Sequence, residues 1–125
     1  SLASSLLIVA LFAFSDACMK VTPGTPGMPA TPACKTCAQT LIMKTTNGAG
    51  SKAFTSDTTS TTGACAMRTL VCDGGDANIE VNAGDSGVIG DNGAGTISFT
   101  VTCNAAGTAW VNGATTVTQL ECAAT

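Results

Sequence analysis

Histidine and tyrosine are absent from this chain of 125 residues, tryptophan occurs once, and charged residues make up only 10%. The lack of histidine excludes Ser-His-Asp and Cys-His nucleophilic sites, histidine metal centres and imidazole pH switches. Lysine and arginine number five against eight acidic residues, which gives a net charge of −3. A nucleic-acid surface needs a basic patch to neutralise phosphates, so nucleic-acid binding is also excluded.

The apolar run at residues 6–14 is too short to span a membrane, which takes about 20 residues. Small residues at Ser15 and Ala17 suit cleavage after Ala17, so residues 1–17 are predicted to be a secretory signal peptide. There are two alternative interpretations. The run could be a buried strand of the folded protein, or it could belong to a bacterial lipoprotein signal, because Cys18 follows directly. The favoured one predicts a secreted, extracellular protein with no membrane span.

Seven cysteines follow, at positions Cys18, Cys34, Cys37, Cys65, Cys72, Cys103 and Cys122. In a short exported chain, spaced cysteines predict a set of disulfides. The last six form an even set, whereas Cys18 stands apart as a free thiol or as a bridge between two chains. Covalent links matter here because Ala, Thr and Gly bury little apolar area, and each disulfide typically adds about 2–4 kcal/mol.

Residues 18–33 form a Thr/Pro-rich segment in which proline recurs at every third position from 23 to 32. Polyproline II has three residues per turn, so this spacing predicts an extended, polyproline-like stalk. Threonine beside proline is also typical of O-glycosylated linkers, with Thr22, Thr25 and Thr31 as candidate acceptors. The alternative is a bare spacer without sugar.

From Cys34 onward the pattern is typical of β-structure. Apolar residues alternate with Ser and Thr over residues 96–103, which predicts a half-buried strand. Asn112-Gly113 predicts a type I′ hairpin turn, with Trp110 opposite Thr115 and Ala109 opposite Thr116.

Gly74-Gly75 predicts a second hairpin. Pairing across it places Cys72 opposite Ala77 and Leu70 opposite Ile79, which gives one continuous apolar face and supports that register.

Three other segments complete the expected organisation: a strand at residues 41–43, a Thr/Ser-rich loop at 55–62 and a long Gly-rich loop at 83–95. No window from Cys34 onward shows sustained helical periodicity. The predicted fold is all-β, a disulfide-stapled antiparallel β-sandwich of the immunoglobulin-like kind over residues 34–125.

The cysteine spacing and its surroundings resemble a known family. The spacing is Cys34-x2-Cys37, Cys65-x6-Cys72, then Cys103 and Cys122, with Gly107-Thr108-Ala109-Trp110 between the last two. It is similar to the six-cysteine domain of nematode secreted and cuticle-associated proteins, over roughly residues 34–122. That family often carries a preceding Thr/Pro-rich segment.

The resemblance implies an extracellular domain with three disulfides, no known catalytic activity, and a bond between Cys34 and Cys65. The other two bonds stay open at this point. One option joins Cys37 to Cys122 and Cys72 to Cys103, and the other joins Cys37 to Cys103 and Cys72 to Cys122.

Several residues have side chains that could carry chemistry, and each has a simpler structural explanation. Cys34-x-x-Cys37 has the spacing of a redox pair or half a zinc site, but no βαβ pattern surrounds it and histidine is absent. Asp85 and Asp91 have calcium-binding oxygens, yet their spacing matches no EF-hand loop. Trp110 favours core packing over sugar stacking. We assign no catalytic residue, no cofactor and no metal ligand.

The favoured hypothesis is a secreted, non-enzymatic structural or extracellular-matrix protein. An extended stalk, an odd cysteine count and strands with few lysines at their edges favour self-association into polymers or filaments, by strand addition or through the N-terminal stalk. The expected partners are further copies or other matrix proteins. The alternative is a soluble recognition module that binds a glycan or a protein through residues 83–95.

Overall fold

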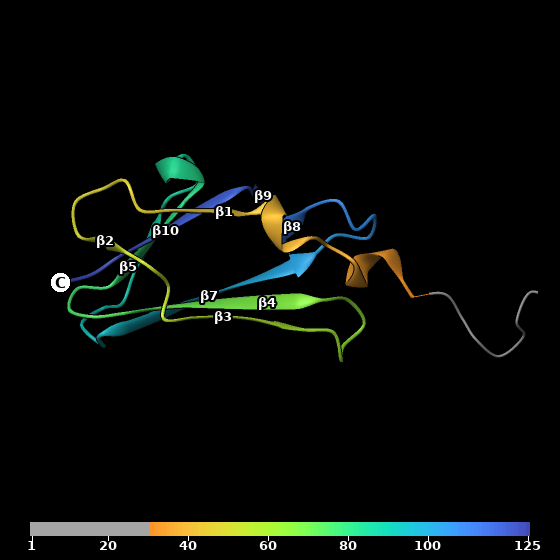
Figure 1. Cartoon of the computed structure of the whole chain (residues 1–125), viewed down its shortest axis with the longest axis horizontal. Helices are drawn as coiled ribbons and strands as arrows, with labels where there is room; N and C mark the ends of the chain where they lie inside the picture. Colours follow the sequence, from red (N-terminus) through yellow and green to blue (C-terminus); the bar gives the residue numbers. More distant parts are fainter. Residues whose placement is uncertain (1–30) are drawn as a thin grey trace, which may run out of the picture. The chain divides into compact units, whose positions relative to one another are not determined.

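The computed structural model describes residues 31–125, which form two β-sheets and three short 3-10 helices (Figure 1). The predicted signal peptide, and the stalk up to residue 30, lie outside the described residues. Pro32 has the dihedral angles of polyproline II (φ −57°, ψ 141°), and Ala33 already begins the first 3-10 helix. The folded unit therefore includes the last residues of the predicted stalk.

Sheet A contains the first and last strands. Its strands are β1 (Met43–Thr45), β2 (Ser51–Lys52), β5 (Asn78–Val81), β6 (Val88–Gly90) and β10 (Gln119–Ala123). The order is β1-β10-β5-β6, with β2 also paired to β10.

Sheet B consists of longer strands in the order β3-β4-β7-β8-β9. They are β3 (Ser56–Ser60), β4 (Met67–Asp73), β7 (Thr96–Cys103), β8 (Trp110–Asn112) and β9 (Thr115–Val117). The 3-10 helices are η1 (Ala33–Lys35), η2 (Gln39–Leu41) and η3 (Asn82–Gly84).

The hydrophobic core draws on both sheets, as the alternation along the strands requires. In β4 every second residue is buried, and β7 shows the same alternation from Phe99 onward, with Ile97 partly buried. The side chains between them are partly or fully exposed. The core is the set Ile42, Ala66, Leu70, Cys72, Ala77, Ile79, Val81, Phe99, Val101, Cys103, Trp110, Val117, Leu120 and Cys122. This confirms an all-β fold of two sheets and the strand predicted at 96–103.

The sheets are not purely antiparallel, because β1 runs parallel to β10, with Met43 paired to Gln119. Parallel neighbours need a long connection, and almost the whole domain lies between these two strands in sequence. The other strand pairs among the described residues are antiparallel.

The hairpin predicted at Gly74-Gly75 is wrong. Strand β4 is flanked on both sides by β3 and β7, so no free edge remains for β5, which belongs to sheet A. The turn instead carries the chain from one sheet to the other. The residues predicted to share an apolar face, Leu70, Cys72, Ala77 and Ile79, are all buried, since facing sheets bury the same pattern as a hairpin.

The hairpin at Asn112-Gly113 exists, but its predicted register is wrong. Trp110 pairs with Val117 and Asn112 with Thr115, so the two-residue loop is Gly113-Ala114. Gly113 has φ 59°, the position at which a type II′ turn requires glycine. This register turns Val117 toward the core beside Trp110. The burial of Val117 explains why it is favoured over the predicted register.

Three other segments also differ from the prediction. The first strand begins at Met43, after η2 rather than at residue 41. Residues 56–60 form β3 instead of a loop, because their β-branched and polar side chains suit a half-exposed edge. The Gly-rich stretch at 83–95 contains β6, where Val88 and Ile89 interrupt the glycines.

Candidate functional site

Strands β6 and β9 end their sheets on the same side of the domain, and a cleft lies between them. Each has a neighbour on one side only among the described residues. The cleft has a volume of about 200 Å³. It is lined by Val81, Ser86, Ile89, Phe99, Asn112 and Thr115. Its apolar floor is therefore an extension of the core that reaches solvent between two strand edges.

The outer edge of β6 presents unpaired backbone groups. Val81 N–H donates to Gly87 O (2.9 Å) and Asp91 N–H donates to Ala77 O (3.0 Å), on either side of the strand. Because antiparallel hydrogen bonds alternate, the backbone groups of Ile89 point toward β5 and those of Val88 and Gly90 point outward. The Val88 side chain is 59% exposed.

Neither β6 nor β9 contains a charged residue. Edge strands usually carry lysine, proline or a bulge that prevents pairing with another chain. β6 and β9 contain neither lysine nor proline. The outer edge of β6 is therefore not blocked in either of these ways, whereas Thr116 O on β9 already accepts a hydrogen bond from Asn82. We call the two strands and the cleft between them the open side.

Asn82 fixes the distance across the open side. Its side-chain oxygen accepts hydrogen bonds from Thr118 N–H (2.8 Å) and Gln119 N–H (3.3 Å). Its side-chain nitrogen donates to Thr116 O (2.9 Å). The left-handed backbone at Asn82 and Ala83 (φ 54° and 57°) directs this side chain from sheet A to the end of β9.

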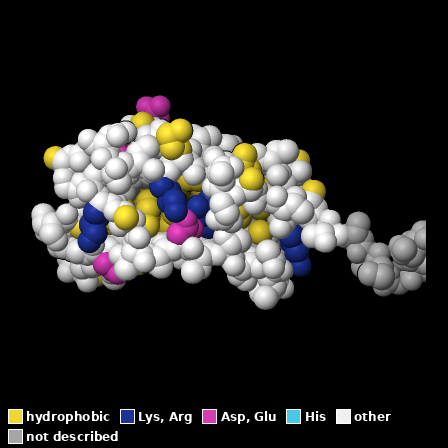
Figure 2. All heavy atoms as spheres, in the orientation of Figure 1, with side chains coloured by type: hydrophobic (Ala, Val, Ile, Leu, Met, Phe, Trp, Pro, Cys, Tyr) yellow, Lys and Arg dark blue, Asp and Glu magenta, His cyan; other side chains and the backbone are white. Residues whose placement is uncertain are grey.

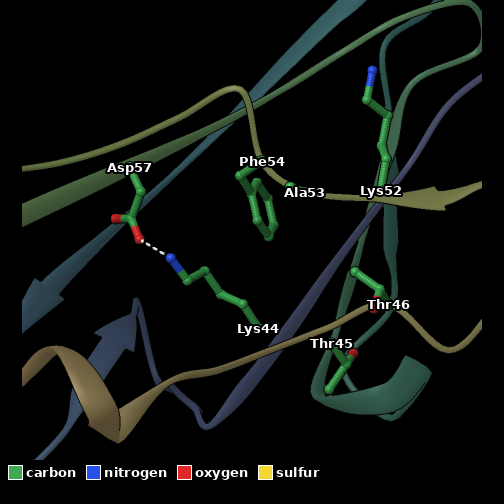
Figure 3. A pocket seen from close by; sticks show the side chains of 7 residues that line it. All are labelled: Lys44, Thr45, Thr46, Lys52, Ala53, Phe54 and Asp57. Atoms are coloured by element: carbon green, nitrogen blue, oxygen red, sulfur yellow. Dashed lines mark hydrogen bonds and ion pairs between the residues drawn. The ribbon is translucent and has the colours of Figure 1, made fainter.

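The opposite side of the domain also has a groove, of about 190 Å³, and an ion pair spans it (Figure 3). Lys44 on β1 reaches across to Asp57 on β3, with Nζ 2.8 Å from Oδ2. Figure 2 shows cationic and acidic side chains meeting over apolar surface on the face in view. Phe54, in the segment that joins β2 to β3, lines the groove.

A buried arginine anchors this ion pair. Arg68 is 1% exposed and donates to both carboxylate oxygens of Asp57 at 2.7 Å. Its remaining nitrogen donates to Gln39 O, and its guanidinium lies 5.8 Å from the centroid of the Trp110 ring. Hydrogen bonding to Arg68 lowers the pKa of Asp57 to about 2. We call this the guarded side.

Three disulfides join the six cysteines of the domain: Cys34–Cys65, Cys37–Cys103 and Cys72–Cys122. The pairing is the second of the two alternatives left open by the sequence. Cys72–Cys122 links β4 of sheet B to β10 of sheet A. The redox interpretation of Cys34 and Cys37 is wrong, because each is bonded to a distant partner.

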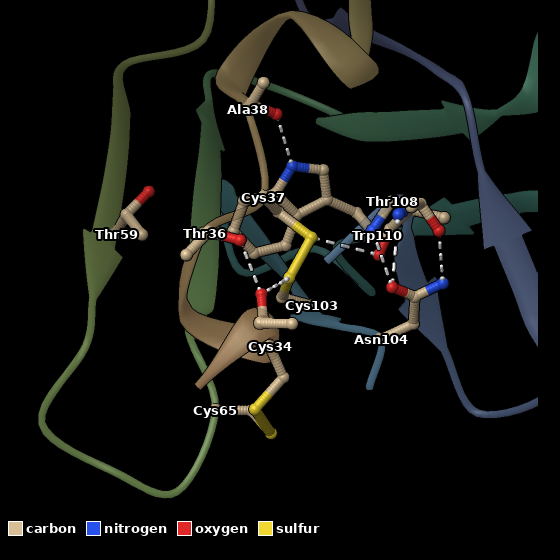
Figure 4. Close-up of a disulfide and its surroundings, with 12 residues drawn as sticks. Cys34, Thr36, Cys37, Ala38, Thr59, Cys65, Cys103, Asn104, Thr108 and Trp110 are labelled. Carbon is tan, nitrogen blue, oxygen red and sulfur yellow. Dashed lines mark hydrogen bonds between the residues drawn. A yellow bond between two sulfur atoms is a disulfide. The ribbon is translucent and has the colours of Figure 1, made fainter. Parts of the chain in front are cut away.

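Near the Cys37–Cys103 bond, Trp110 is fully buried (Figure 4). Its indole N–H donates to Ala38 O at 2.9 Å, which satisfies its only polar group. Trp110 is thus a core residue that holds the segment after Cys37 against β8.

Two further carboxylates hold loops through backbone groups. Glu121 accepts hydrogen bonds from Thr45 Oγ1 (2.6 Å), Asn47 N–H (3.0 Å) and Gly48 N–H (2.8 Å). The bond from Thr45, with those from the two amides, lowers the pKa of Glu121 to about 2. The carboxylate therefore fixes the loop between β1 and β2.

Asp91 likewise fixes a loop, in the Gly-rich segment, by accepting hydrogen bonds from backbone amides. It accepts from the amides of Gly93 (2.8 Å), Gly95 (2.9 Å) and Ala77 (3.1 Å), and the first of these contributes most to lowering its pKa. Among residues 31–125, no three His, Cys, Asp or Glu side chains gather closely enough to hold a metal ion. The structure does not bring Asp85 and Asp91 into such a group.

The other predicted site residues fall mostly outside the described part. Cys18, Thr22 and Thr25 lie there, whereas Thr31 is described and exposed. The sequence analysis did not predict that β6 and β9 lie beside one cleft. The uncharged pair Val88-Ile89, which stands between glycines, could have indicated an edge strand. Within residues 31–125, no helix is both long and apolar enough to cross a membrane.

The class of protein follows from these features: a small all-β domain whose two sheets are stapled by three disulfides. A family model described as the C6 domain matches residues 34–122, and the chain belongs to that family. This confirms the nematode six-cysteine family that the cysteine spacing predicts.

One similar protein is the uncharacterized protein R07B1.7 of Caenorhabditis elegans, which is 41% identical over 75 residues. The match covers 57% of this chain and 51% of that protein, so the chain spans about half the length of this relative. No solved structure matches the chain.

Proposed function

We propose that this chain is a secreted, non-enzymatic structural protein of the extracellular matrix that associates with further copies of itself. Three disulfides in so small a domain support an oxidising, extracellular location. The two-layer arrangement around a shared core supports assignment to the immunoglobulin-like sandwiches. The uncharged outer edge of β6, with its unpaired backbone groups, is the observation that carries the proposal.

The contact we propose is β-strand addition on the open side. In this mode an extended segment pairs with a free sheet edge, and its alternate side chains fill pockets beside that edge. Outward backbone groups of Val88 and Gly90 supply the pairing, and the cleft over Phe99 receives the inward side chains. The volume of about 200 Å³ suits one large apolar side chain.

The donor in this proposal is the N-terminal segment of a neighbouring copy. Proline lacks an amide hydrogen and cannot pair fully, so the donor is the stretch before the first proline, residues 18–22. There Met19 and Val21 alternate with polar residues, as a half-buried strand requires. The Pro-rich residues 23–30 that follow would span roughly 25 Å when extended, which would let the donor reach another domain.

Cys18 and the stalk threonines have roles beside strand addition in this proposal. A disulfide between Cys18 residues of two polymers would join those polymers covalently. O-glycans on Thr22, Thr25 and Thr31 would keep the stalk extended and soluble.

A charge placed at the open edge tests the proposal. In Val88→Lys, a lysine on β6 hinders pairing with another strand, as lysines do on natural edges. We expect the concentration for half-assembly, measured by analytical ultracentrifugation under oxidising conditions, to rise by about tenfold or more. Val21→Pro, which disables the donor outside the folded unit, has the same effect.

The matched control is Met43→Lys, because Met43 is 62% exposed on β1 and the substitution adds the same charge on the guarded side. Assembly of this variant equals that of the wild type. If the wild-type protein stays strictly monomeric at high concentration, and glycan or protein binding is lost on replacing residues 83–95, the recognition-module alternative is correct instead.

A further inference from the structure

Asparagine is followed by glycine three times in the chain, at Asn47-Gly48, Asn92-Gly93 and Asn112-Gly113. This dipeptide is especially open to spontaneous loss of the side-chain amide, because glycine has no Cβ to shield its own backbone nitrogen. All three asparagines are exposed. From the sequence alone, the three sites are therefore equivalent candidates for the reaction.

The reaction has two steps. The backbone nitrogen of the glycine attacks Cγ of the asparagine side chain, so that an N–Cγ bond forms and the Cγ–Nδ2 bond breaks. The side-chain nitrogen takes up the proton of the glycine N–H and leaves as ammonia, and a cyclic imide remains. Water then opens the imide at either carbonyl, which gives aspartate or isoaspartate. A fold controls the first step through the group that holds the glycine N–H.

In two of the three pairs a carboxylate holds this N–H group. Gly48 N–H donates to Oε2 of Glu121 (2.8 Å), and Gly93 N–H donates to Oδ1 of Asp91 (2.8 Å). A carboxylate opposes loss of the proton that it accepts, because an anionic nitrogen would then face a second negative charge. The nitrogen would also have to give up a charge-assisted hydrogen bond before it attacks.

The Gly113 N–H is not held in this way. It lies in the two-residue loop between β8 and β9, and it donates to no acceptor within residues 31–125. The loop closes a ladder of three residue pairs at the edge of sheet B, so local opening costs little. Asn112 Nδ2 donates to Thr100 O (3.0 Å), which is one neutral, exposed hydrogen bond and a weaker restraint than a carboxylate.

The position of Asn112 gives the reaction a consequence for the open side. Asn112 lines the cleft there, together with Ile89 and Phe99. Conversion to an acid places a carboxylate opposite Thr100 O and ends the hydrogen bond that Nδ2 donates. An apolar side chain that filled the cleft would also strip water from this carboxylate, which costs free energy.

We infer that Asn112 is a site of spontaneous deamidation in the folded chain, and that the acid formed there closes the open side as the protein ages. The modification is independent of the proposed function, whereas its effect on assembly rests on that function.

Peptide mapping by mass spectrometry tests the modification. Conversion at the three asparagines is followed in warm, neutral buffer, both in the folded full chain with its disulfides intact and in the same chain reduced and unfolded in denaturant. We expect similar rates at the three sites in the unfolded chain. In the folded chain, Asn47 and Asn92 convert about tenfold or more slowly than Asn112, because each must first lose a bond to a carboxylate.

Gly113→Ala is the matched variant for the mechanism. Its added methyl group shields the attacking nitrogen, so conversion at Asn112 slows in the folded and the unfolded chain alike. If Asn112 of the folded wild type converts no faster than Asn47 and Asn92, the fold does not select this site and the inference is overturned.

Assembly tests the consequence. Asn112→Asp raises the concentration for half-assembly by about tenfold, whereas Thr58→Asp, which adds the same charge at an exposed position on β3, leaves it unchanged. Aged wild type behaves like Asn112→Asp, and aged Asn112→Ser assembles like fresh protein. Wild-type assembly of Asn112→Asp would show that the acid does not close the open side. A wild-type chain that stays monomeric contradicts the proposed function instead and leaves the peptide mapping unaffected.

Discussion

At the scale of single residues, two carboxylates make links that strand pairing does not supply. Glu121 fixes the loop between β1 and β2, and Asp57 fixes Arg68 and Lys44. Both have folded-state pKa values lowered to about 2. A lowered pKa stabilises the fold above the pKa of the unfolded chain, near 4, and that stabilisation is lost as pH falls toward 2.

We therefore predict that acid weakens the wild-type protein and that Glu121→Gln reduces this dependence. The carboxylate accepts hydrogen bonds from the backbone N–H groups of Asn47 and Gly48. In glutamine an NH₂ group replaces one of the two accepting oxygens, so one of these bonds is lost and the variant is less stable at pH 5. It also has one fewer carboxylate to protonate. Thermal unfolding by circular dichroism at pH 5 and pH 2 measures both effects.

Asp57 keeps its own acid sensitivity in this variant, so some pH dependence remains. An equal fall in Tm between pH 5 and pH 2 for wild type and variant would show that Glu121 is not held in its charged form by the fold.

At the scale of elements, a glycine near the disulfides decides how closely two segments approach. Gly107 has φ 73°, and a Cβ built there would collide with Ala33 O and lie 2.7 Å from Thr36 Oγ1. The loop between β7 and β8 thus packs directly on η1, beside the Cys34–Cys65 and Cys37–Cys103 bonds. Gly113 shares the positive φ but has open space around it.

This contrast gives a matched pair of substitutions. Gly107→Ala combines backbone strain with displacement of η1 and should cost about 2–3 kcal/mol of unfolding free energy. Gly113→Ala has the strain alone and should cost about 1 kcal/mol. Guanidinium unfolding with the disulfides intact measures the two values. Equal costs would mean that the close approach of Gly107 to η1 does not matter for stability.

A strand could be predicted where its own sequence pattern determines it. It could not be predicted where pairing with other strands, or contact with the core, determines it. The alternation in β7 is enough to give a strand, because each inward side chain is apolar. Strand β3 has no apolar side chain and forms through pairing with β4 and through Asp57. The β8–β9 register depends on Val117 reaching the core, which turn chemistry alone does not specify.

At the scale of the whole molecule, the sequence predicted the composition of the core better than its topology. The same apolar residues are buried whether β4 and β5 form a hairpin or face each other from two sheets. Only the neighbours of β4, which come from distant segments, distinguish these cases. The candidate site has the same origin, since the open side exists only because β6 and β9 end two different sheets on one side.

The domain as a whole is asymmetric in a way that supports its proposed role. The guarded side places Lys44 and Asp57 between its sheet edges, whereas the open side has free backbone groups over an apolar cleft. Three disulfides add to the stability that the small hydrophobic core supplies. A rigid unit with one guarded and one open side suits assembly in a single direction.

Hydrogen–deuterium exchange of the wild-type chain, compared at dilute and assembling concentrations, tests the central claim most directly. We predict that amides of peptides covering 86–91 become protected on assembly, because the outward groups of β6 acquire a partner strand. Peptides covering 43–60, on the guarded side, exchange equally at both concentrations. Unchanged exchange at β6 in an assembled sample, or new protection at 43–60 instead, would contradict the account.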